Sequence, residues 1–191
     1  MKRIWIASVA GAAVVTMSFL LGQVMAGGPE DGVKKIIDLI KKGDNAGAKK
    51  AAQAYAKDQA KNEAAMEDLM HLMKPAAKKG LTVLGNKDGI EQTLIKVGRD
   101  APTAAGMTKN AEVYAEMGHI VTAIALVTEA SSKSQKFGGK KTEKDWNDWA
   151  KAMHDNGIKL AEAGKSKSSA DVKTAATKIN AACNSCHTAF R

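Results

Sequence analysis

The residues best suited to chemistry stand together near the end of the sequence. The run Cys183-Asn184-Ser185-Cys186-His187 contains both cysteines and one of the four histidines of the chain. A Cys-x-x-Cys-His run is the pattern at which haem is covalently attached. On a helix its spacing places Cys183, Cys186 and His187 on one face. Two thiols can then bond the two vinyl groups of the porphyrin edge while the imidazole reaches the iron. We therefore predict one covalently attached haem c, with His187 as the proximal iron ligand.

Three other interpretations of the two cysteines have less support. A thioredoxin-type redox pair opens a helix in an α/β fold, and this chain shows no strand pattern. A zinc site would need a second pair of ligands, and none is suitably spaced. A disulfide between Cys183 and Cys186 would be strained, because the two residues lie so close within one helix.

The elements that must position this motif are predicted to be helices. The chain has 191 residues, of which 45% are apolar, 26% charged and only 4% aromatic. That composition is typical of one globular domain, or at most two small ones, with a core of aliphatic side chains and methionine. Apolar residues recur at the helical period, and capping or breaking residues separate the runs. The expected helices cover 31–42, 46–73, 88–99, 108–130, 142–164 and 168–190.

Short connections between the later helices favour antiparallel packing. We predict an all-α fold, an up-down four-helix bundle whose long helices are 46–73, 108–130, 142–164 and 168–190. The segments 31–42 and 88–99 are then an extra short N-terminal helix and a short inserted helix. Asp88 with Glu91, Thr142 with Asp145 and Ser168 with Asp171 resemble helix-capping pairs.

The first 26 residues are predicted to be a signal peptide. Lys2 and Arg3 precede an apolar run, and Val24 and Ala26 form a small-residue cleavage site. The alternative is a retained N-terminal anchor. Cleavage after Ala26 would leave residues 27–191 as a single periplasmic domain. It would also remove two of the basic residues and lower the net charge from +9 to +7. No other segment is apolar for long enough to span a membrane, so no stable membrane insertion is expected after signal removal.

The C-terminal signature resembles a known family. Cys183-Asn184-Ser185-Cys186-His187-Thr188-Ala189-Phe190-Arg191 is similar to the ending of the class II c-type cytochromes, the cytochrome c prime family. The resemblance covers roughly residues 46–191 and implies a four-helix bundle, often dimeric, with the haem between helices. Residues 27–45 and the insertion at 85–102 depart from a minimal family member.

The resemblance also implies that the distal haem face is covered by the first bundle helix. There, Met70 aligns with the distal position, followed in preference by Met73 and Met66. A methionine ligand would make the iron low-spin and close it to small ligands. The alternative is that these methionines only pack in the hydrophobic core and bind no iron. His71 could instead bind the iron, but not together with Met70.

His119 and His154 are expected to be surface or structural residues. The partner of the haem propionates stays open among Lys74, Lys78, Lys79 and Arg191.

These observations predict a periplasmic electron carrier, not an enzyme, with acidic redox partners and a possible homodimer. The alternative is a five-coordinate protein that binds nitric oxide or carbon monoxide. A third hypothesis is a haem subunit of a larger complex, docking through residues 27–58 or 85–107. Nucleic acid is not an expected partner, because the sequence has no long basic run interleaved with aromatic residues.

Overall fold

The computed structural model describes residues 30–62, 64–84, 86–137 and 141–189, together with the backbone of Pro29 and Phe190. The predicted signal peptide, residues 1–26, lies outside these residues. The described segments are helical, and their only β feature is an isolated bridge between Val83 and Asn86. The elements are α1 (Pro29–Lys41), α2 (Asn45–Gln59), α3 (Ala65–His71), η1 (Ala76–Lys78), α4 (Gly89–Arg99), α5 (Ala104–Ala130), η2 (Ser132–Ser134), α6 (Glu143–Lys165) and α7 (Ser169–Phe190).

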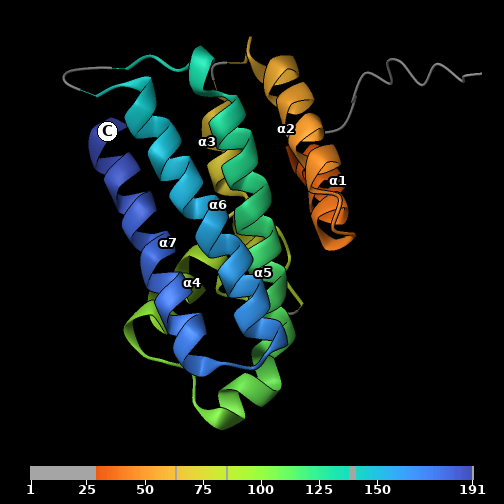
Figure 1. Cartoon of the computed structure of the whole chain (residues 1–191), viewed down its shortest axis with the longest axis vertical. Helices are drawn as coiled ribbons and strands as arrows, with labels where there is room; N and C mark the ends of the chain where they lie inside the picture. Colours follow the sequence, from red (N-terminus) through yellow and green to blue (C-terminus); the bar gives the residue numbers. More distant parts are fainter. Residues whose placement is uncertain (1–28, 63, 85, 138–140, 191) are drawn as a thin grey trace, which may run out of the picture.

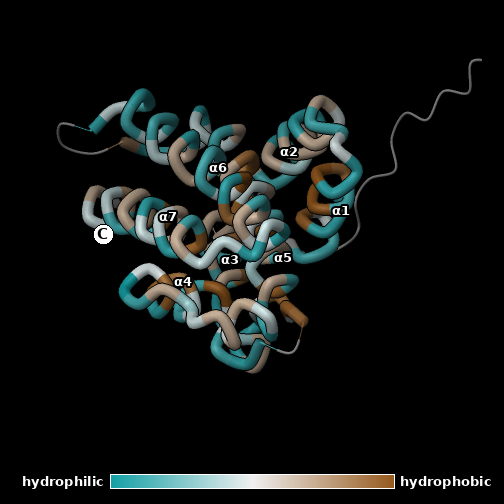
Figure 2. The backbone as a smooth tube through the Cα atoms, turned by 60° about the horizontal axis from the view of Figure 1, so that its bottom comes forward, coloured by the Kyte–Doolittle hydropathy of each residue, from teal (hydrophilic) through white to brown (hydrophobic). Residues whose placement is uncertain are grey.

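The predicted all-α class is confirmed as a helical bundle. The long helices α5, α6 and α7 pack side by side and alternate in direction, so the end of α7 lies near the α5–α6 connection (Figure 1). The helices α1 and α2 cover one side of α5, while α4 packs on α7 at the other side (Figure 2). Residues 117–128 of α5 are all buried. A helix that is apolar all round belongs in the centre of a bundle, and α5 takes that place.

Glycines bring α5 and α6 into close contact. A Cβ atom at Gly118 of α5 would lie 2.3 Å from the backbone nitrogen of Ala161 in α6. On the α6 side, a Cβ at Gly164 would lie 2.5 Å from the nitrogen of Ala115. Real Cβ atoms essentially never come this close to other atoms. The absence of a side chain at these positions therefore sets the spacing of the two helices.

The predicted long helix over residues 46–73 is wrong in one respect, because the chain leaves the helix after Gln59 and forms α3 only from Ala65. The side-chain oxygen of Asn62 accepts a hydrogen bond from the backbone N–H of Ala64 at 3.1 Å. Asparagine side chains compete in this way with helical backbone bonds. The break lets α3 take a direction independent of α2.

Two predicted helix starts also need correction. The helix expected from residue 108 begins at Ala104, because the Thr103 side chain caps it by accepting from the N–H of Gly106. Asp88 makes no capping bond to α4 and instead contacts Lys96 Nζ at 2.5 Å. The capping box of Thr142 and Asp145 is confirmed at the start of α6. Within the described part of the chain, no helix is long and apolar enough to cross a membrane.

Candidate haem site

One cavity of about 730 Å³ lies beside the C-terminal part of α7. This volume is within the range of small-molecule and cofactor sites, roughly 300–1,000 Å³. Its walls come from α2, α3 and the turn between them, from the end of α5 and its connection to α6, and from α6 and α7. The lining residues are Tyr55, Ala56, Gln59, Ala60, Lys61, Asn62, Ala65, Met66, Leu69, Met70, Val127, Ser131, Ser134, Gln135, Lys136, Trp146, Cys186 and His187.

The cavity brings together predicted site residues from two distant parts of the chain. His187 and Cys186 line it from α7, and Met70 lines it from α3. Cys183 is half-buried and packs against the hydrophobic core beside this wall, without lining the cavity itself. The helix therefore presents part of the Cys-x-x-Cys-His motif to a preformed hollow.

The fold places the three methionine candidates for the distal position in two different environments. Met66 and Met70 are half-buried and both line the cavity, one helical turn apart on α3. Met73 is buried in the hydrophobic core and does not line the cavity. His71 is also absent from the lining, and its Nε2 lies 3.8 Å from Oε1 of Glu67.

The short helix α3 is held by the core and by the turn that precedes it. Leu69 is buried on the same helix as Met70, so its packing fixes the face that α3 turns inward. The Asn62 turn sets the point at which α3 begins. Together they determine how the Met66 and Met70 side chains meet the cavity.

Burial disfavours the thiolate form of both cysteines. Burial raises the pKa of the Cys183 thiol to about 11, with a smaller contribution from the nearby Cys186. Burial also raises the pKa of the Cys186 thiol. Redox-active cysteines have lowered pKa values, because the thiolate is the reactive form. Both cysteines are free thiols, with no disulfide between them.

The cavity lining combines apolar and polar side chains. Trp146 is buried, and its indole Nε1 donates to the backbone oxygen of Thr128 at 2.7 Å, so the ring is fixed at the wall. Phe137 meets the Trp146 ring edge-on, with centroids 6.2 Å apart. The exposed polar side chains of the lining form its polar edge, namely Lys61, Asn62, Ser134 and Lys136. Gln59, Gln135 and the buried Ser131 add further polar groups to the lining.

The donor set and the polarity of this cavity fit a haem. Imidazole and thioether groups are the usual axial ligands of haem iron in cytochromes, and thiols attach the ring. An apolar interior with a polar edge matches a porphyrin, whose two carboxylates lie along one side. The buried hydroxyl oxygen of Tyr55 has no hydrogen-bond partner in the described structure. Such orphaned groups call for an explanation, and an acceptor bound in the cavity would provide one.

Sequence reasoning missed the residues of this polar edge. Of the propionate candidates, Lys74 pairs with Glu91, and neither Lys78 nor Lys79 lines the cavity. Arg191 lies outside the described residues. Lys61 and Lys136 do line the cavity, yet both lie in turns that carry no motif. No local signal distinguishes them from the other lysines.

The remaining candidate ligands lie elsewhere. His119 is buried on α5, where burial and then the charge of Lys165 lower its pKa. Nδ1 of His154 lies 3.1 Å from the Asp155 carboxylate. Among the described residues, no three His, Cys, Asp or Glu side chains gather as a metal site. This result gives the zinc alternative no support.

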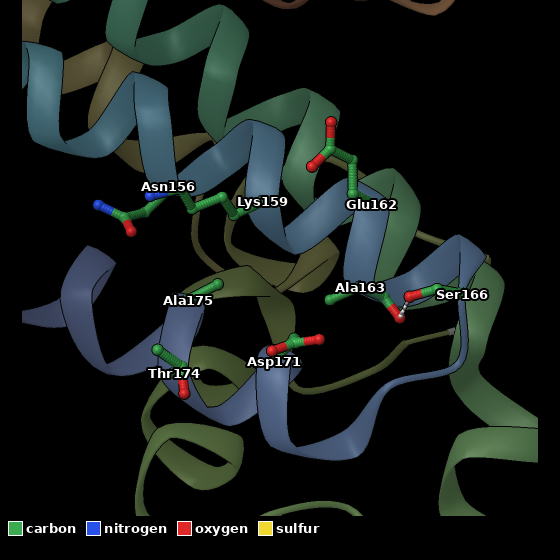
Figure 3. A pocket seen from close by; sticks show the side chains of 8 residues that line it. All are labelled: Asn156, Lys159, Glu162, Ala163, Ser166, Asp171, Thr174 and Ala175. Atoms are coloured by element: carbon green, nitrogen blue, oxygen red, sulfur yellow. Dashed lines mark hydrogen bonds between the residues drawn. The ribbon is translucent and has the colours of Figure 1, made fainter.

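A second, smaller cavity of about 320 Å³ lies between α6 and the start of α7 (Figure 3). Lys159 and Glu162 line it from α6, and Asp171 and Thr174 line it from α7. Its lining mixes both signs of charge and contains none of the haem-site residues predicted from the sequence. It offers no donor set for a haem.

Comparison with known proteins supports the same interpretation. The sequence model of the family described as Cytochrome C' matches residues 95–191, just over half of the chain. The matched segment contains Cys183, Cys186 and His187 but not Met70. No curated protein and no solved structure gives a significant match.

Proposed function

Because the chain belongs to the cytochrome C' family, we propose that it is an electron-transfer protein. In this proposal Cys183 and Cys186 attach one haem c, His187 is the proximal ligand and Met70 the distal ligand. The observation that carries the proposal is the cavity that Cys186, His187 and Met70 line together. The haem supplies an iron that accepts and releases one electron.

The protein residues have distinct tasks in this proposal. Cys183 and Cys186 would hold the haem through thioether bonds to its two vinyl groups, with each thiol adding across one double bond so that no leaving group would form. The two bonds prevent dissociation and fix the ring beside α7. His187 lies directly after Cys186, so attachment also holds its imidazole toward the cavity. Val127 and Trp146 exclude water from the apolar interior, which favours a small change in solvation when charge moves.

Whether a side chain coordinates the iron on the distal side distinguishes electron transfer from gas binding. Met66, Leu69 and Met70 form an apolar wall on α3. A Met70 thioether bound to iron would occupy the sixth position and leave no site for a diatomic ligand. The alternative function is binding of nitric oxide or carbon monoxide, and it is favoured by the same apolar wall if Met70 only covers the iron.

We further propose that the protein works in the periplasm with acidic redox partners. The basic start, apolar run and small-residue site of residues 1–26 support export, and covalent haem attachment is compatible with that location. After removal of residues 1–26 the chain would carry a net charge of +7, because Lys2 and Arg3 leave with the signal peptide, and this charge would accelerate encounter with partners of opposite charge. No catalytic reaction is proposed.

Optical spectroscopy of the exported, haem-loaded protein tests the function. Oxidised, reduced, and reduced samples with carbon monoxide should be compared. Low-spin spectra, a methionine–iron charge-transfer band and no response to carbon monoxide are expected for the electron carrier. A high-spin spectrum that changes with carbon monoxide would instead establish the gas-binding alternative. A protein without haem absorbance would overturn both.

A further inference from the structure

Two lysines from separate connections meet at the edge of the haem cavity. Lys61 lies in the turn between α2 and α3, and Lys136 lies between η2 and α6. Both are exposed at the surface and both line the cavity. The fold therefore places two positive charges beside the same hollow.

These two charges have no acidic partner in the described structure. Lys41, Lys74 and Lys96 each pair with a carboxylate, as do several other lysines. No ion pair includes Lys61 or Lys136, and the described lining of the cavity contains no aspartate or glutamate. Two unpaired positive charges beside one hollow attract an anionic group.

We propose that Lys61 and Lys136 bind the two haem propionates and so position the polar edge of the haem. This inference rests on the proposed function and adds two residues that sequence analysis did not identify. The ammonium groups are compact charges on long stems that can reach carboxylates along the cavity edge. They act as positioning residues, because they orient the ring while the attachment and ligation remain with other side chains.

The chemical consequence is a change in carboxylate ionisation and in the reduction potential. A positive charge within about 4–6 Å lowers a carboxyl pKa by about 1–3 units. The two lysines therefore keep the propionates ionised and partly cancel their charge. Removal of the lysines leaves more uncompensated negative charge near the iron, which favours the ferric state and lowers the midpoint potential.

The experiment compares Lys61→Gln, Lys136→Gln and the double variant with matched controls. Lys57→Gln and Lys133→Gln remove the same charge from exposed positions close by in the chain, and neither residue lines the cavity. Haem content is measured first, by absorbance of the denatured protein. Midpoint potentials are then measured from pH 5 to 9 at about 0.15 M salt, where the screening length is about 8 Å.

All variants should retain covalently bound haem and the wild-type ligation spectrum. The cavity variants should have lower midpoint potentials than their controls. The pH at which their potential begins to change should rise by about one unit, with a larger shift in the double variant. Lys61→Arg with Lys136→Arg should restore the wild-type profile, because the positive charges return.

The inference is overturned if the double cavity variant and the double control give the same potentials and the same pH profile while both contain covalent haem. A wild-type protein without covalent haem would be a different result, since it would overturn the proposed function itself.

Discussion

Met70 of α3 and His187 of α7 line one cavity, although they come from distant parts of the chain. The family match includes His187 and stops short of Met70. The family match therefore does not cover the part of the chain that would supply the distal ligand in the proposed function. Its position depends on the turn at Asn62 and on the packing of Leu69.

Met70→Ala should open the sixth coordination position, because alanine has no sulfur to bind iron. The expected result is a high-spin spectrum that responds to carbon monoxide. Met66→Ala is the matched control, since Met66 lines the same cavity one turn earlier on α3. A low-spin Met70→Ala protein together with a high-spin Met66→Ala protein would assign the ligand to Met66.

Met73→Ala should lower stability and leave the spectrum unchanged. Met73 is buried in the core and lies outside the cavity lining. Truncation of a buried methionine to alanine costs about 2–5 kcal/mol. Denaturant unfolding checks the stability, and the optical spectrum checks the ligation. Loss of low-spin ligation in this variant would contradict the placement of Met73.

Cys183→Ser and Cys186→Ser should each leave one bond between protein and haem. The double variant should contain no covalent haem, because both attachment sulfurs are gone. Haem staining after denaturing electrophoresis and intact mass together give the result. Haem that stays bound to the denatured double variant would show that attachment uses another side chain.

Gly118→Ala should destabilise the bundle, because its Cβ would lie 2.3 Å from the backbone of Ala161. Overpacking of this kind costs about 1–3 kcal/mol. Gly106→Ala in the same helix is the control, since its nearest new contact is the Thr103 side chain at 3.3 Å. It should be neutral or stabilising by up to about 1 kcal/mol. Thermal unfolding of the two variants should separate them clearly, and equal melting temperatures would contradict the close contact.

His119 should make the protein less stable in mild acid. Burial lowers its pKa below the ordinary value of 6.5, so the unfolded chain binds a proton at a higher pH than the folded chain does. The stabilisation is complete above pH 6.5 and is lost as the pH falls toward the folded-state pKa. Unfolding free energies at pH 8 and pH 5 should differ less in His119→Gln than in the wild type. An unchanged difference would show that His119 does not contribute.

The sequence alone was sufficient to predict the helical class, and it also predicts haem attachment at the C-terminal motif. Both depend on short-range order: the apolar period selects helices, and the spacing of Cys183, Cys186 and His187 sets a shared face. The capping box at Thr142 and Asp145 is local in the same sense, and the structure confirms it.

Only the tertiary structure decided what surrounds the motif. The helix break after Gln59 arises because the Asn62 side chain competes with the helical backbone, which apolar periodicity does not report. Packing against the core directs Met73 away from the cavity and leaves Met66 and Met70 beside it. Lys61 and Lys136 meet there because two turns far apart in sequence are brought to one place by helix packing. Long-range packing fixes such neighbours, whereas the sequence pattern specifies only each helix by itself.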